Sequence, residues 1–115
     1  MKKILITDVT LRDGNHAISH KMTIIQIAVY AAAADAAGIP IVEVGHGNGL
    51  GASSLQVGES AITDEMMLSV AKKNLPHAKL GIHVIPGFAT INKDLKKALD
   101  IGVDVVRIEI GRAHV

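Results

Sequence analysis

"TIIQIAVYAAAADAAGIPIVEV", residues 23–44, predicts a helix followed directly by a buried strand. Thr23 and Gln26 have the T-x-x-Q spacing of a capping box, so we expect the helix to begin at Thr23. The apolar, alanine-rich run that follows ends at Gly38, a residue type that commonly terminates helices. "IPIVEV", residues 39–44, is short, apolar and β-branched, as expected of a strand.

The same alternation of strand and helix continues on both sides of this segment. Strands are expected at residues 3–8, 79–85 and 103–108, and further helices after an N-cap at Thr63 and over residues 92–101. The order β-α-β-α-β-α-β predicts an α/β fold with a parallel sheet and right-handed crossovers. Two closures remain open: a doubly wound open sheet, or the first half of a (β/α)8 barrel. A whole barrel needs about 250 residues.

Composition narrows the classes of protein to consider. The 115 residues carry a net charge of +1 and no basic cluster, which does not support nucleic-acid binding. The chain has no cysteine and no apolar run long enough to cross a bilayer, so we expect a cytoplasmic protein without disulfides or a membrane segment. The N-terminal "MKKILIT" lacks the sustained apolar region of a signal peptide.

A glycine-rich loop, "GHGNGLGAS" at residues 45–53, follows the strand at 39–44. Its glycines do not have the G-x-G-x-x-G register of a dinucleotide-binding loop. The spacing favours either a turn with positive φ angles or a loop whose backbone approaches a small ligand. A complete small α/β module that binds an anion through this loop therefore remains an alternative.

Polar chemistry gathers in "VTLRDGNHAISH", residues 9–20, directly after the first strand. Asp13 supplies oxygen ligands suited to Mg²⁺ or Mn²⁺, and Arg12 supplies donors for a carboxylate or an oxyanion. His16 can accept a proton near neutral pH. These residue types suit a metal-bound keto acid. The alternative is a structural Arg–Asp ion pair beside a solvated histidine.

"TLRDG", residues 10–14, resembles the signature of the metal-dependent lyases and synthases related to HMG-CoA lyase and isopropylmalate synthase, which are (β/α)8 barrels. In the synthases, glutamine usually stands where this sequence has His16. With "VEVGHGNGLGASS" at 42–54 and "IPGFAT" at 85–90, the sequence resembles the 4-hydroxy-2-oxovalerate aldolase branch over residues 3–108. That branch usually has aspartate at the position of Asn48.

The resemblance implies a set of roles. Asp13 would bind the divalent metal, typically Mn²⁺ with Mg²⁺ or Co²⁺ as alternatives, and both Asp13 and Arg12 would contact the substrate. Arg12 would stabilise the pyruvate enolate, and His16 would be the base that removes the C4 hydroxyl proton. The reaction would split 4-hydroxy-2-oxovalerate into pyruvate and acetaldehyde, in the catabolism of aromatic compounds. A Claisen-type synthase or HMG-CoA-lyase-like enzyme is the alternative within the superfamily.

Other residues receive supporting expectations. The resemblance implies that Glu43 steadies the arginine, whereas the strand position alone is equally compatible with a buried carboxylate that binds backbone donors. His46 is expected to contact substrate and His20 to support the site or lie at the surface. His83 is expected to serve packing, and Arg107 receives no role.

The resemblance also implies parts that lie beyond this sequence. The family's remaining metal ligands are a His-x-His pair on a later strand, and a later tyrosine closes the site. In such enzymes an acylating acetaldehyde dehydrogenase receives the aldehyde. We expect residues 1–108 to be the N-terminal part of the barrel, truncated after its fourth strand. Residues 109–115, "EIGRAHV", are expected to be a non-native tail, since a common sequencing adapter encodes "IGRAHV" before a stop codon.

Overall fold

The computed structural model describes residues 4–47, 49–52, 62–85 and 91–109, without the side chains of His16, Ile91 and Asn92. Asn48, most of "IPGFAT" and residues 110–115 of the expected tail therefore lie outside the described residues. No helix in the described part of the chain has the length and apolar character needed to cross a membrane. The elements are β1 (Thr7–Asp8), a 3₁₀ helix η1 (Asp13–Ile18), α1 (Ile24–Ala36), β2 (Ile41–Glu43), α2 (Asp64–Lys73), β3 (Lys79–Val84), a π-helical turn η2 (Ile91–Leu95), α3 (Lys96–Ile101) and β4 (Val105–Ile108).

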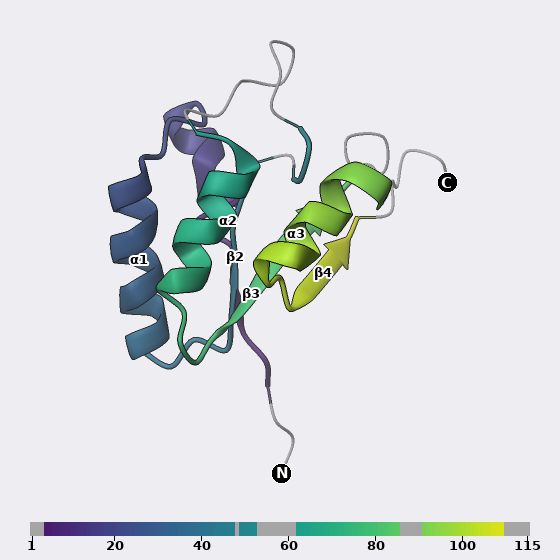
Figure 1. Cartoon of the computed structure of the whole chain (residues 1–115). Coiled ribbons are helices and arrows are strands. Elements are labelled where there is room, and N and C mark those ends of the chain that lie inside the picture. Colours follow the sequence, from purple (N-terminus) through teal and green to yellow (C-terminus); the bar gives the residue numbers. More distant parts are fainter. Residues whose placement is uncertain (1–3, 48, 53–61, 86–90, 110–115) are drawn as a thin grey trace.

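The four strands form one parallel sheet in the order β1-β2-β3-β4, which confirms the predicted α/β fold. Each crossover moves one strand further in the same direction. Since crossovers are right-handed, this places successive helices on the same face of the sheet. Figure 1 shows α1, α2 and α3 side by side on that face. A doubly wound sheet would instead reverse its strand order and carry helices on both faces, so the order favours the barrel arrangement.

The hydrophobic core lies between the sheet and the helices. Val42 of β2 and Leu80 and Ile82 of β3 are almost completely buried. They pack with Ile27 of α1 and Met67 of α2 in one cluster. Alternate strand residues face the other side of the sheet, so the polar residues between them, including Glu43, point away from the helices.

Local capping explains where the first two helices begin. The N–H of Gln26 donates to Thr23 Oγ1 (3.2 Å), and the N–H of Thr23 donates to Gln26 Oε1 (2.8 Å), so the predicted capping box is present. Thr63 caps α2 in the same way through the N–H of Met66. After α1, Gly38 has a positive φ of 83°, which a glycine adopts without strain.

The first strand is shorter than the prediction of residues 3–8. Pairing begins only at Thr7, which lies opposite Ile41, and residues 4–6 are exposed and unpaired. Pro40 precedes Ile41 and has no N–H, so it cannot donate a hydrogen bond to the segment before Thr7.

β2 (Ile41–Glu43) and β4 (Val105–Ile108) are also shorter than the strands expected at 39–44 and 103–108. Two further segments differ from the prediction in kind. The loop expected from residue 9 to Met22 contains the 3₁₀ helix η1, which carries Asp13 and the backbone of His16. The third helix, expected over residues 92–101, begins with the wider turn η2, and only Lys96–Ile101 is α-helical. Its end at Gly102, in the left-handed conformation with φ 118°, agrees with the prediction.

Candidate active site

A polar cluster lies on the face of the sheet opposite the helices, toward the carboxyl ends of the strands. Glu43 of β2 pairs with Gly81 of β3, and His83 of β3 pairs with Arg107 of β4. Since side chains alternate along a strand, Glu43, His83 and Arg107 project from this same face. The sheet register therefore brings together charged groups from distant parts of the sequence.

Arg12 reaches this cluster from the turn that follows β1. The N–H groups of Arg12 and Asp13 both donate to Val9 O, at 3.1 and 2.7 Å. The Arg12 side chain is buried, its Nε donates to Glu43 Oε2 (2.9 Å), and its Nη1 donates to Gly47 O (2.9 Å). None of the residues that the structure describes accepts a hydrogen bond from Nη2. The guanidinium is thus held from two sides by Glu43 and Gly47.

Glu43 is shared by two arginines. Arg107 donates from Nε to Oε1 (2.9 Å) and from Nη2 to Oε2 (3.0 Å), while Arg12 also donates to Oε2. Burial alone would raise the pKa of Glu43, but the hydrogen bonds and charges of Arg107 and Arg12 outweigh it and lower the pKa. Glu43 is therefore ionised at neutral pH. The predicted contact between Glu43 and Arg12 is present in the structure.

Asp13 lies beside Nη1 of Arg12, the nitrogen that also donates to Gly47 O. Its side chain is 61% exposed, and Oδ1 lies 3.4 Å from Arg12 Nη1. An exposed carboxylate at the carboxyl end of a strand suits one ligand of a hard divalent cation. No group of three or more potential ligands occurs among the described side chains, which do not include His16. Asp13 therefore fits as a single metal ligand, and the expected ligand set would need residues from elsewhere.

The loops after β1 and β2 are joined beside this cluster. Asn15 is buried and its Nδ2 donates to Gly45 O (2.7 Å), while the N–H of His20 donates to Asn15 O (2.7 Å). The ring of His20 stacks on that of His46 with centroids 3.6 Å apart. Ser19 and His20 both have positive φ angles, of 53° and 61°. Non-glycine residues adopt this conformation only where surrounding contacts enforce it.

The two histidines are placed more deeply than a loop position suggests. His46 is fully buried and His20 is 5% exposed. His20 is buried against His46 rather than lying at the surface, and its expected supporting role stays a prediction. The expected contact between His46 and substrate stays a prediction, since in this structure its ring is covered. The expected role of His16 as a base also stays a prediction.

His83 of β3 is 2% exposed, in agreement with a packing position. Burial lowers the pKa of its imidazole, and the positive charges of Arg12 and Arg107 lower it further. A neutral His83 adds no third positive charge to the cluster at neutral pH.

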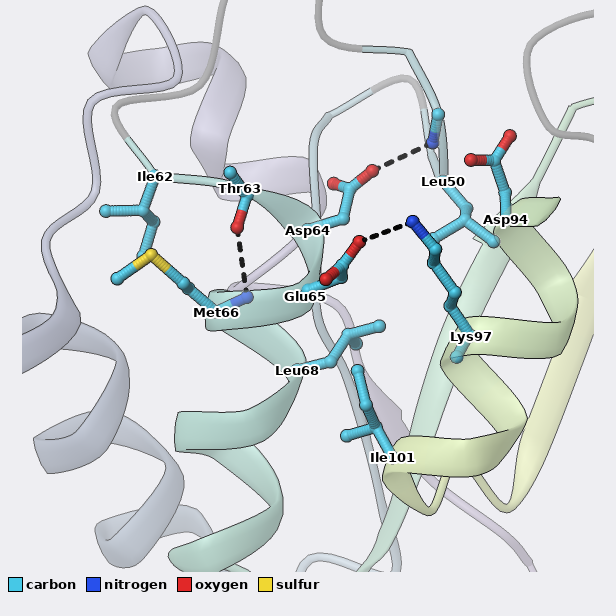
Figure 2. Close-up of a pocket in the computed structure, with 12 residues that line it drawn as sticks. Leu50, Ile62, Thr63, Asp64, Glu65, Met66, Leu68, Asp94, Lys97 and Ile101 are labelled. Carbon is cyan, nitrogen blue, oxygen red and sulfur yellow. Dashed lines mark hydrogen bonds and ion pairs between the residues drawn. The ribbon is translucent and has the colours of Figure 1, made fainter.

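A separate pocket of about 560 Å³ lies between α2 and α3 (Figure 2). Asp64 accepts a hydrogen bond from the N–H of Gly51 (2.9 Å), and Glu65 pairs with Lys97 (3.1 Å). Burial raises the pKa of Asp64. None of the residues predicted for the active site lines this pocket.

Two residues of the cluster were not identified by sequence reasoning. The sequence pattern assigns no role to Arg107, although a lone cation in the apolar run "VDVVRI" indicates that an anion or solvent lies nearby. Asn15 was read as part of a polar loop. Its buried position depends on the fold of η1, which the sequence pattern did not predict.

Comparison with known proteins supports the resemblance. The HMGL-like family model matches residues 3–114. A 4-hydroxy-2-oxovalerate aldolase of Spirochaeta aurantia is 65% identical over 105 residues, covering 91% of this chain and 31% of the relative. Proteins of the same name from Pectobacterium atrosepticum and Salinispora arenicola are 54% identical over 107 residues and 56% over 106, covering 93% and 92% of this chain and 31% and 30% of the relatives. The chain thus spans about a third of the length of the curated relatives it matches.

Proposed function

Because this chain belongs to the HMGL-like family, we propose that it forms part of a divalent-metal-dependent aldolase that cleaves 4-hydroxy-2-oxovalerate to pyruvate and acetaldehyde. The proposal concerns a protein with a completed barrel, since the chain spans only 31% of the aldolase from Spirochaeta aurantia. The 115 residues alone are expected to be inactive. The names of the relatives and the geometry around Arg12 support the assignment.

The buried guanidinium of Arg12 is the observation that carries this proposal. Glu43 and Gly47 O hold it on two sides, and Nη2 has no acceptor among the described residues. A donor fixed before the reaction stabilises charge that develops on an oxygen without first having to reorganise. Retro-aldol cleavage of a 2-oxo acid develops such a charge on the C2 oxygen.

Asp13 would supply one ligand to a divalent cation beside this donor. When bound, the cation would polarise the keto acid as a Lewis acid. The Asp13 side chain is exposed beside Arg12, so both residues can face one small anionic substrate. Mn²⁺ is the expected ion, with Mg²⁺ and Co²⁺ as alternatives.

The proposed reaction assigns each bond change to a residue. His16 takes the proton of the C4 hydroxyl, and the C3–C4 bond breaks as the C4 oxygen becomes the carbonyl of acetaldehyde. The bonding pair forms the C2–C3 double bond of the enolate, whose oxygen Arg12 stabilises. Protonation at C3 then gives pyruvate. The His16 backbone lies in η1, the same short helix as Asp13.

The test uses a grafted enzyme, in which residues 3–108 of this chain replace the matching segment of the Spirochaeta aurantia relative. We expect Mn²⁺-dependent release of pyruvate, followed by reduction with lactate dehydrogenase and NADH. Arg12→Ala should lower kcat about 100- to 1,000-fold, as loss of an oxyanion donor does elsewhere. A folded graft that binds Mn²⁺ but releases no pyruvate would contradict the proposal.

His16→Gln separates the aldolase from the Claisen-type alternative, because glutamine cannot act as the base. The variant should lose aldol cleavage and keep its affinity for pyruvate. Aldol cleavage equal to that of the unsubstituted graft would remove His16 from the mechanism. Condensation of an acyl-CoA with a keto acid by the unsubstituted graft would favour the synthase alternative.

The remaining parts of the proposal concern the cellular setting. A role in the catabolism of aromatic compounds, a cytoplasmic location and transfer of acetaldehyde to an acylating acetaldehyde dehydrogenase accompany the assignment to the aldolase branch. Co-purification of the grafted enzyme with such a dehydrogenase would test the partnership. An acetaldehyde product that equilibrates fully with the bulk solvent in the presence of the dehydrogenase would contradict it.

A further inference from the structure

Arg107 is the charged residue of the cluster that the proposed chemistry does not use. It lies on β4, its side chain is half exposed, and both of its hydrogen bonds to described residues go to Glu43. The two residues are 64 positions apart in the sequence. An arginine that binds a buried carboxylate across a sheet either fixes the position of that carboxylate or is itself held in position by it.

A missing side chain on β3, at Gly81, permits the contact between Arg107 and Glu43. Glu43 is on β2 and Arg107 is on β4, so β3 lies between them. The β3 residue in register with Glu43 is Gly81, which has no side chain to separate the two groups. An added Cβ at Gly81 would lie 3.3 Å from Ile41 Cγ2, in a contact tighter than is usual. The arrangement therefore brings the guanidinium of Arg107 across β3 to Glu43.

The hydrogen bonds show what Arg107 does to Glu43. Arg107 is the donor to Oε1 among the described residues, while Oε2 accepts from both Arg107 and Arg12. The terminal torsion of a glutamate side chain is soft, so one hydrogen bond leaves a carboxylate able to rotate. Contacts from a planar fork to both oxygens fix its plane. Oε2 is then held where Arg12 Nε meets it at 2.9 Å.

We infer that Arg107 is a positioning residue for Arg12, acting through Glu43 to hold the Arg12 guanidinium against the reacting oxygen of the substrate. This inference rests on the proposed aldol cleavage. Arg107 donates to both oxygens of Glu43 from the β4 side, whereas Nη2 of Arg12 donates to none of the residues that the structure describes. Arg107 therefore orients the Glu43 carboxylate, and Arg12 contacts the substrate.

The kinetic test compares Arg107→Met and Arg107→Lys in the grafted enzyme. Misplacing Arg12 weakens an interaction made mainly in the transition state, so Arg107→Met should lower kcat about 100-fold and leave KM within about twofold. Lysine keeps the charge but not the fork, so Arg107→Lys should recover part of that loss. Lys97→Met removes the cation of the exposed Glu65 ion pair and is the matched control, with unchanged kcat.

Two kinetic outcomes would overturn the inference. A kcat of Arg107→Met within twofold of the unsubstituted graft, per folded molecule, would mean that Arg107 does not position the catalytic arginine. A large rise in KM at constant kcat would mean that Arg107 binds the substrate itself.

A crystal structure of the Arg107→Met graft gives a readout without turnover. We expect the Glu43 carboxylate to rotate and its contact with Arg12 Nε to be lost. An unchanged contact would overturn the inference even if the graft is inactive. Absence of pyruvate release from the unsubstituted graft, by contrast, would contradict the aldolase assignment while this structural comparison still decides the role of Arg107.

Discussion

The imidazole rings of His20 and His46 lie parallel, with centroids 3.6 Å apart and 5° between their planes. The stack joins the loop that carries Arg12 and Asp13 to the loop that follows β2. It is buried, so removing one ring leaves a cavity between the two loops. The two loops of the proposed site are therefore held together by the His20–His46 stack, and neither ring needs to touch the substrate for this.

His46→Ala should destabilise the grafted enzyme by about 3 kcal/mol, the order seen when a buried ring is truncated. His46→Phe keeps a ring for stacking and should cost less. The measurement is the urea concentration at half-unfolding. Lys21→Ala, at an exposed position next to His20, is the control and should shift this concentration little. Equal shifts for His46→Ala and Lys21→Ala would contradict a structural role for the stack.

Gly49 should not tolerate a side chain. Its φ is 94°, and an added Cβ would lie 2.6 Å from His83 O, which also accepts the N–H of Leu50. Gly38→Ala is a matched control, because its φ is 83° and an added Cβ there has no neighbour within 4 Å among the described atoms. Gly38→Ala should cost about 1 kcal/mol for the left-handed backbone alone.

Gly49→Ala adds the steric clash with the β3 backbone to that cost, and we expect it to exceed Gly38→Ala by about 1–3 kcal/mol. Chemical denaturation of the two variants measures the difference. Equal stabilities would show that the loop can move away from β3 without penalty.

Asp35 should make stability depend on acid pH. Its carboxylate accepts the N–H of Ala78 (2.6 Å) and the N–H of His77 (2.9 Å), and lies 3.0 Å from the His77 ring. The backbone hydrogen bond from Ala78 is the main cause of its lowered pKa, which burial opposes and His77 supports. Because the folded pKa is below the unfolded value, the stabilisation is complete above the unfolded pKa. It is lost as pH falls through the folded pKa.

Asp35→Asn should therefore be less stable than the parent at pH 7, and the difference should shrink below about pH 4. Thermal melts at a series of pH values measure it. Asp100→Asn, at an exposed position of α3, serves as control. A difference for Asp35→Asn that is constant from pH 7 to pH 3 would show that ionisation of Asp35 does not stabilise the fold.

The 115-residue polypeptide by itself should self-associate. Ile4 and Leu5 beside β1 are 84% and 74% exposed, and Ile108 of β4 is 61% exposed. Open edges of a parallel sheet with apolar side chains pair readily with other chains. We expect sedimentation velocity to show dimers or aggregates, and Ile4→Lys combined with Leu5→Lys to reduce them. A stable monomer with Mn²⁺-dependent pyruvate release would contradict this expectation and the expected inactivity of the isolated chain.

The parts of the fold that could be predicted depend on local chemistry. Thr23 and Thr63 cap their helices because a hydroxyl needs only the next turn of backbone to bind. Gly102 ends α3 because its own conformation suffices. The shortened β1 was not predictable from its apolar run, since its pairing also depends on where β2 begins, at Ile41.

The candidate site likewise contains residues that a local motif predicts and residues whose roles depend on the folded structure. Arg12 and Asp13 could be named from one short motif, and the resemblance implied the contact of Arg12 with Glu43. The part played by Arg107 could not, because it depends on three strands in register and on the missing side chain at Gly81. The burial of His46 likewise depends on a turn with strained angles at His20 that no local pattern indicated.

The most direct test of the central claim is the stoichiometry of products from the unsubstituted grafted enzyme. With 4-hydroxy-2-oxovalerate and Mn²⁺, the account predicts equal amounts of pyruvate and acetaldehyde, each measured by its NADH-linked reductase, and loss of both on addition of EDTA. A folded graft with bound Mn²⁺ that leaves the substrate intact, or that forms pyruvate without acetaldehyde, would contradict it.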